Sequence, residues 1–118
     1  MTKNKEELEY RKAHNDKVME LIIEESEWAQ KNRKPFADPG HVAITLYEEI
    51  LEAYEELLTI YYMWKYWFEK CVRGNLHIET KEVLDEIRKT AGNVAAESTQ
   101  IGAVADKALE TFKKWRDE

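Results

Sequence analysis

Residues 41–58 read HVAITLYEEILEAYEELL, a strong helical pattern that carries five glutamates. At about 100° per residue, Glu49, Glu52 and Glu56 fall within roughly 60° of one another on the helix surface. This acidic strip borders an apolar stripe, which comprises Val42, Leu46, Ile50, Ala53, Leu57 and Ile60. We therefore expect a long helix that carries carboxylates at the edge of a buried surface.

Three carboxylates on one rigid helix suit a magnesium site. They offer hard oxygen ligands and leave room for waters and substrate phosphates. Acidic residues about four apart are also common on solvated helix surfaces, and the spacing alone does not separate the two interpretations. Glu48 and Glu55 point further outward, toward water.

The composition predicts an all-α protein. A chain of 118 residues with four Gly, two Pro and 36% charged residues is most simply a single helical domain over residues 1–118. The net charge of −6 argues against nucleic acid and anionic lipid as partners. A single cysteine, Cys71, and the lack of a signal pattern or long apolar run predict a cytoplasmic protein without a membrane segment.

The breaks in the pattern predict an antiparallel bundle of about three long helices. The first begins near residues 2–5 and ends at 30–34, and its segment 1–17 is mostly charged, as in a frayed or partner-contacting extension. A loop with two prolines, in which Phe36 should pack down, leads to a second helix from about 41 to 73. A third helix, with Thr80 as its N-cap, should run toward residue 115.

The second half of the middle helix is apolar around nearly its whole circumference. Residues 60–68 read IYYMWKYWF, and such a helix must be covered on every side. Three helices of one chain offer too little surface, so we expect oligomerisation, as a homodimer or homotetramer, to complete the bundle. The expected interface residues are Tyr61, Trp64, Trp67 and Phe68. The alternative is an aromatic cradle that stacks a nucleobase.

Residues 90–105, TAGNVAAESTQIGAVA, form a small-residue segment in which Glu97 is the only charge. An ionised carboxylate in such a segment is costly unless it is paired or bound to a metal. Asn93 and Gln100 lie on the same side of the predicted helix and offer oxygen atoms. A structural carboxylate, paired with a nearby Arg, Lys or Tyr, is the other interpretation of Glu97.

The order of these features resembles the MazG-like nucleotide pyrophosphatases, within the all-α NTP pyrophosphatase superfamily. Residues 24–32, EESEWAQKN, resemble the end of the first helix in that family. Residues 46–53, LYEEILEA, resemble its Glu-Glu-x-x-Glu motif, whose second and fifth places bind Mg²⁺. Those places are Glu49 and Glu52 here.

The second motif of the family, Glu-x-x-Asp, lies on the next helix. Glu97-x-x-Gln100 stands in the small-residue segment, where the motif belongs, with Gln in place of Asp. Glu82-x-x-Asp85 fits the letters but stands at the helix start. Position favours Glu97, and the text around it resembles a phage and prophage branch of these proteins.

The resemblance implies a nucleoside triphosphate pyrophosphohydrolase that depends on Mg²⁺ or Mn²⁺ and releases a nucleoside monophosphate and pyrophosphate. The implied metal ligands are Glu49, Glu52, Glu97 and Gln100. Glu48 or Glu56 would orient or deprotonate the attacking water. The candidate substrate contacts are Asn93, Trp64 and Tyr61.

Two other classes of function compete with this interpretation. One is a non-catalytic helical interaction or regulatory protein that kept the bundle and lost part of the metal site, which Gln100 favours. The other is a structural, coiled-coil-like oligomer without a ligand. The clustered glutamates argue against the second, because a purely structural helix would carry apolar residues at those positions.

Overall fold

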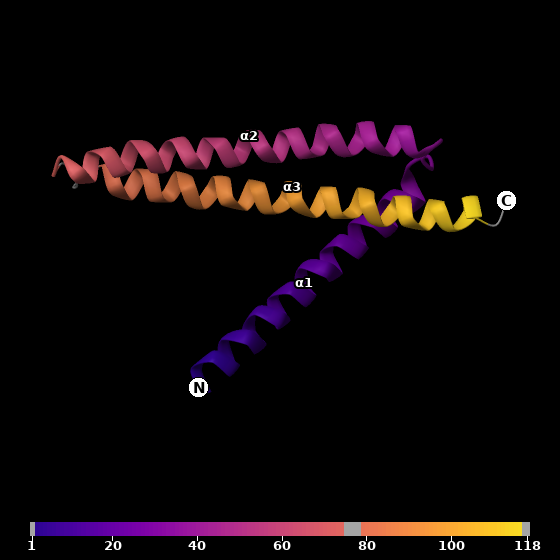
Figure 1. The fold of residues 1–118 in the computed structure, drawn as a ribbon, viewed down its shortest axis with the longest axis horizontal. Helices are drawn as coiled ribbons and strands as arrows, with labels where there is room; N and C mark the ends of the chain where they lie inside the picture. The colour runs from indigo at the N-terminus through magenta and orange to yellow at the C-terminus, as the bar shows by residue number, and fades with distance from the viewer. Residues whose placement is uncertain (1, 75–78, 117–118) are drawn as a thin grey trace. The chain divides into compact units, whose positions relative to one another are not determined.

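The computed structural model describes residues 2–74 and 79–116 and contains three helices and, in these ranges, no strand. They are α1 (Thr2–Asn32), α2 (Pro39–Val72) and α3 (Glu79–Arg116) (Figure 1). The predicted all-α class is confirmed. None of the described helices combines the length and apolarity needed to span a membrane.

Side-chain and backbone contacts explain where α2 begins and ends. The Asp38 carboxylate accepts a hydrogen bond from the backbone N–H of His41 at 2.8 Å, and Pro39 occupies the first helical position. Gly74 follows the helix with a φ of +79°, a conformation that glycine adopts without strain. The helix therefore starts slightly before the predicted residue 41.

The predicted N-cap of α3 is wrong. The helix already includes Glu79, so Thr80 lies inside it. The hydroxyl of Thr80 instead accepts a hydrogen bond from the Trp67 indole at 3.1 Å. This contact ties the beginning of α3 to the end of α2.

The chain forms two compact units, and α2 and α3 each contribute to both. Unit 1 comprises Met1–Leu46 and Thr99–Glu118, and unit 2 comprises Tyr47–Ser98. The prediction of a single domain over residues 1–118 stays a prediction. In α1 the described side chains of residues 4–17 are all exposed.

Unit 1 contains a small core around the loop between α1 and α2. Phe36, Val42 and Ala108 are buried there, so the loop packs down as predicted. Lys107 is also buried: its ammonium lies 4.5 Å from the centre of the Phe36 ring and donates a hydrogen bond to the Lys34 carbonyl at 2.8 Å. Burial, followed by the charge of Arg33, lowers the pKa of Lys107.

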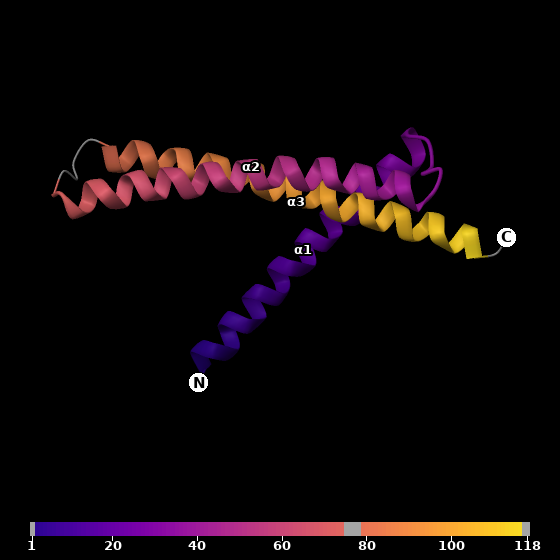
Figure 2. The ribbon, with the colours of Figure 1, turned by 45° about the horizontal axis from the view of Figure 1, so that its top comes forward.

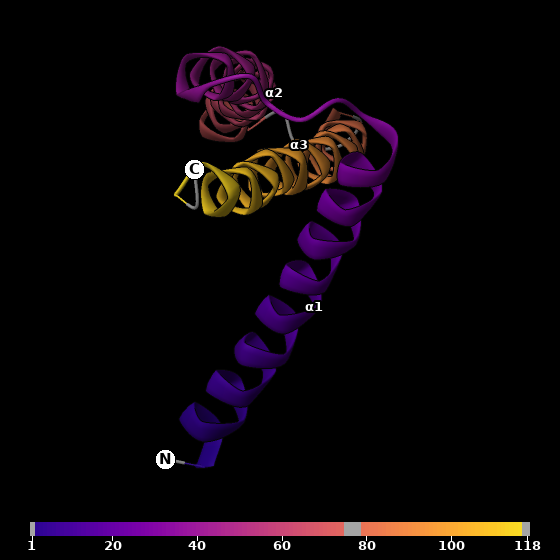
Figure 3. The ribbon, with the colours of Figure 1, turned by 90° about the vertical axis from the view of Figure 1, so that its right-hand side faces the viewer.

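The helices α1 and α3 approach closely within unit 1 (Figure 3). A Cβ atom built on Gly102 would lie 2.7 Å from the Cδ1 of Ile22, so this glycine permits the contact. Nearby, the Gln100 amide donates a hydrogen bond to the Glu25 carboxylate at 3.0 Å. The small residues of the 90–105 segment thus serve helix packing here.

Unit 2 is an antiparallel helical hairpin, in which the parts of α2 and α3 lie side by side (Figure 2). Trp67 contacts Thr80, whereas Glu52 contacts Glu97, so residue numbers rise on one helix as they fall on the other. Half-buried side chains recur on α2 every three or four residues: Glu49, Ala53, Glu56, Ile60, Met63, Trp67 and Lys70.

The predicted apolar stripe of α2 is wrong at two positions. Ile50 and Leu57 are 51% and 54% exposed, whereas Glu49 and Glu56 are half-buried. The face of α2 that packs inward therefore lies closer to the carboxylates than the predicted apolar stripe does. At these two positions the helix turns apolar residues outward.

Candidate metal centre

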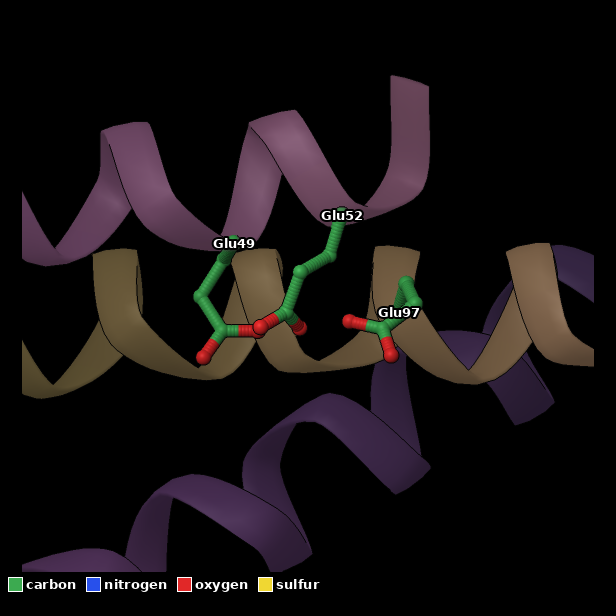
Figure 4. Close-up of side chains that lie close together, drawn as sticks. All are labelled: Glu49, Glu52 and Glu97. Atoms are coloured by element: carbon green, nitrogen blue, oxygen red, sulfur yellow. The ribbon is translucent and has the colours of Figure 1, made fainter. Parts of the chain in front are cut away.

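Glu49 and Glu52 of α2 and Glu97 of α3 converge within unit 2. Each offers a carboxylate oxygen, and these three oxygens all lie within 4.8 Å of one another. Figure 4 shows the carboxylates of Glu49 and Glu52 extending from α2 toward that of Glu97. Glu49 and Glu97 are half-buried and Glu52 is exposed, so the group is reachable from solvent.

Regular helix packing accounts for this convergence. Glu97 belongs to a stripe of half-buried or buried residues on α3, which comprises Val83, Ile87, Thr90, Val94 and Glu97. The spacing of four, three, four and three residues directs this stripe toward α2. The residues next to Glu97 along α3 have small side chains, among them Ala95, Ala96 and Ser98. Glu49 and Glu97 therefore occupy positions at which a hairpin would ordinarily place apolar side chains.

The neighbouring carboxylate of Glu97 raises the pKa of Glu52. The largest cause is a side-chain hydrogen bond with Glu97, followed by the negative charge of Glu97. Desolvation and the charges of Glu48 and Glu55 add to the effect. In the part of the chain that the structure describes, no Lys, Arg or His forms an ion pair with Glu49, Glu52 or Glu97. The site carries a negative charge that calls for a proton or a cation.

The two candidates for water activation lie on different faces of α2. Glu48 is exposed, and its negative charge helps to raise the pKa of Glu52, which lies one turn away. Glu56 is half-buried on the inward face, also one turn from Glu52. Neither belongs to the group of three carboxylates.

Gln100 and Asn93 flank Glu97 along α3. Gln100 belongs to unit 1, where its amide is engaged by Glu25. Asn93 is exposed, one turn before Glu97. The residue that sequence reasoning missed here is Glu25, because a contact across 75 positions leaves no trace in local spacing.

The alternative second motif, Glu82-x-x-Asp85, lies elsewhere. Asp85 pairs with Lys89 at 3.1 Å and with Arg88. Hydrogen bonds from Lys89, then Arg88, lower the pKa of Asp85. This carboxylate is already neutralised by cations, in contrast to the group around Glu97.

Tyr61 and Trp64 lie on the exposed face of α2, with ring centres 6.0 Å apart. They line an open, apolar groove of about 510 Å³. Trp64 is about 18 Å along the helix from Glu52, given 1.5 Å per residue. The predicted stacking on a nucleobase stays a prediction.

The donor set fits a hard divalent cation. Three carboxylates from two helices supply charged oxygen ligands, and the mutual repulsion that raises the pKa of Glu52 would be relieved by a cation between them. One exposed member leaves a side open for waters or substrate oxygens. Mg²⁺ typically keeps several such ligands.

Comparisons with protein-family models, with curated proteins and with solved structures find no match to this chain.

Proposed function

We propose that Glu49, Glu52 and Glu97 bind Mg²⁺ or Mn²⁺ in a metal-dependent nucleoside triphosphate pyrophosphohydrolase. The observation that carries this proposal is the convergence of three carboxylates without a basic partner among the described residues. The resemblance to MazG-like nucleotide pyrophosphatases of the phage and prophage type supplies the reaction. Its products are a nucleoside monophosphate and pyrophosphate.

The charge of the site defines what it can bind. A triphosphate is a polyanion, and Glu48 and Glu55 add negative charge around Glu52. A divalent cation held by the three carboxylates supplies charge neutralisation for the phosphate oxygens when bound. Substrate affinity should therefore depend on the metal, and a chelator should abolish activity.

The remaining roles fall to residues close to this group along the helices. Glu48, which is exposed, or Glu56, which is half-buried, orients or deprotonates the water that attacks the α–β linkage. Asn93 offers an exposed amide to the substrate. The homodimer or homotetramer remains part of the proposal, supported by the exposure of Tyr61 and Trp64.

The test is pyrophosphate release from a panel of canonical and modified NTPs and dNTPs with Mg²⁺ or Mn²⁺. Glu49→Ala should lower the rate at least about 100-fold, the scale of losing a main electrostatic contribution. The matched control is Glu86→Ala, because Glu86 is an exposed acid of unit 2 that lies 3.7 Å from Lys89. Equal rates for the two variants, or no release from any nucleotide, would contradict the proposal.

A second candidate is a catalytically degenerate helical interaction protein. The hydrogen bond between Gln100 and Glu25 favours this second candidate, because Gln100 stands at the place where the family carries an acidic metal ligand. Metal-induced thermal stabilisation separates the two candidates. The enzyme should be stabilised by Mg²⁺ or Mn²⁺ and lose this response in Glu49→Ala, whereas the interaction protein should show no response in either form.

A further inference from the structure

The outward face of α2 in unit 2 carries a continuous row of large apolar side chains, here called the outer stripe. It comprises Tyr47, Ile50, Tyr54, Leu57, Tyr61, Trp64, Phe68 and Cys71. Its seven large members are between 44% and 65% exposed. Intervals of three and four residues alternate along its whole length, which is the pattern of a coiled-coil seam. The stripe is centred about 120° around α2 from the half-buried Glu49 and Glu56.

The size of the outer stripe exceeds what a lone protein usually exposes. If each large side chain contributes about 100 Å², the stripe offers on the order of 700 Å². A standard interface buries about 800 Å² per partner, whereas isolated patches on monomers reach about 300–600 Å². The ring of Trp64 stacks on that of Phe68 with centres 5.3 Å apart, and the ring of Tyr61 lies 6.0 Å from that of Trp64, so the aromatic members form a continuous surface.

We propose that a second copy of this chain covers the outer stripe, with the two α2 helices antiparallel about a two-fold axis. The charge along α2 selects this occupant and this direction. Residues 48–56 contain five glutamates, whereas residues 65–73 contain Lys65, Lys70 and Arg73 against one glutamate. An antiparallel pair places the acidic half of each helix beside the basic half of the other, and a parallel pair opposes like charges.

The spacing also defines the register of the pair. In an antiparallel seam, the two kinds of seam position pair with each other across the interface. When Leu57 is opposite Tyr61 of the second copy, every other stripe residue finds a stripe residue: Tyr54 with Trp64, Ile50 with Phe68, and Tyr47 with Cys71. The groove lined by Tyr54, Leu57, Tyr61 and Trp64 then lies at the centre and receives the same residues of the copy.

Cysteine crosslinking tests this register directly. Tyr47→Cys should form a covalent dimer on mild oxidation, through disulfides between Cys71 and the new thiol of the second copy. The two positions lie about 36 Å apart along one helix, too far for a disulfide within one chain. The controls are the wild type, with Cys71 alone, and Thr59→Cys, an exposed position on the opposite side of α2. Neither should crosslink.

Two results would overturn the proposal. Crosslinking of the wild type through Cys71 alone would indicate a parallel pair. A monomer by analytical ultracentrifugation, with no crosslink in Tyr47→Cys, would leave the outer stripe to another occupant, such as a helix of a different protein.

A matched pair of tyrosines provides an independent measurement. Tyr61 belongs to the stripe and is 51% exposed, and Tyr66 lies on the opposite side of α2 at 47%. Tyr61→Lys should raise the dimer dissociation constant at least about 30-fold, as for a central interface residue. Tyr66→Lys should leave the constant within about threefold of the wild-type value, because an exposed side chain away from the interface contributes little. Equal effects of the two substitutions would contradict the proposed interface.

Discussion

The two units of this chain use helix packing in opposite ways. Unit 1 contains most of the buried side chains among the described residues, including Phe36, Val42 and Ala108 around a buried Lys107. In unit 2, Thr90 is the only described residue that is buried to this degree. Its hairpin partly buries Glu49 and Glu97 and leaves Tyr54, Tyr61 and Trp64 exposed.

This difference links unit 1 to the stability of the fold and unit 2 to the candidate function. In unit 1 a small residue permits close helix contact at Gly102, and the buried Lys107 has its own hydrogen-bond acceptor. Unit 2 carries two features that a self-sufficient hairpin would avoid: like charges that lie together and a wide exposed apolar face. A cation inside and a second copy outside would each satisfy one of them.

Substitutions at two glycines test the packing side of this comparison and should have the largest effect. Gly102→Ala must displace Ile22, whereas a Cβ built on Gly92 has no described atom within 4 Å apart from the adjoining residues and backbone of its own helix. Both changes gain the helix propensity of alanine, so the difference between them isolates the clash. Gly102→Ala should be less stable than Gly92→Ala by about 1–3 kcal/mol in urea unfolding. Equal stabilities would mean that the helices of unit 1 do not meet at this residue.

The charges of unit 2 should produce two pH dependences of opposite sign, with smaller effects. The folded-state pKa of Glu52 is raised, so the folded state holds its proton more tightly and loses stability as pH rises through that pKa. The folded-state pKa of Asp85 is lowered, so its pairing with Lys89 stabilises the fold at neutral pH and is lost as pH falls.

The variants Glu52→Gln and Asp85→Asn measure these dependences in the presence of a chelator. Relative to wild type, Glu52→Gln should gain stability as pH rises above 4.5, whereas Asp85→Asn should lose stability as pH rises toward 3.8 and then stay less stable up to neutral pH. Thermal unfolding between acidic and neutral pH is the measurement. Adding Mg²⁺ at neutral pH should remove the advantage of Glu52→Gln, because a cation relieves the same repulsion. Slopes of the same sign would contradict the account.

The sequence was sufficient for the fold class and the helix positions, because Pro39, Gly74 and the long periodic segments are strong local signals. The contrast between one charge and its small neighbours singled out Glu97, and its pairing with Glu49 and Glu52 followed from the resemblance of the two motifs to those of a known family. The orientation of α2 was less predictable. Glutamates and apolar residues alternate so closely that only the partner helix decides whether Glu49 or Ile50 faces inward.

Contacts between residues that are far apart in the sequence cannot be predicted from local sequence patterns. The resemblance to the second motif predicts Gln100 as a metal ligand, yet its amide donates a hydrogen bond to Glu25 of α1. The local pattern predicts Thr80 as a helix cap, yet its hydroxyl accepts a hydrogen bond from the Trp67 indole N–H. In both cases a tertiary hydrogen bond involves a side chain whose local pattern suggested another role.

The most direct test of the central claim is a calorimetric titration of the metal-free protein with Mn²⁺ at neutral pH. We predict saturable binding to the wild type and to Glu86→Gln, and binding at least about tenfold weaker to Glu97→Gln, because one of three ligands is lost. Weak, non-saturable binding that is the same for all three proteins would contradict the account, and the carboxylates would then be a solvated acidic surface.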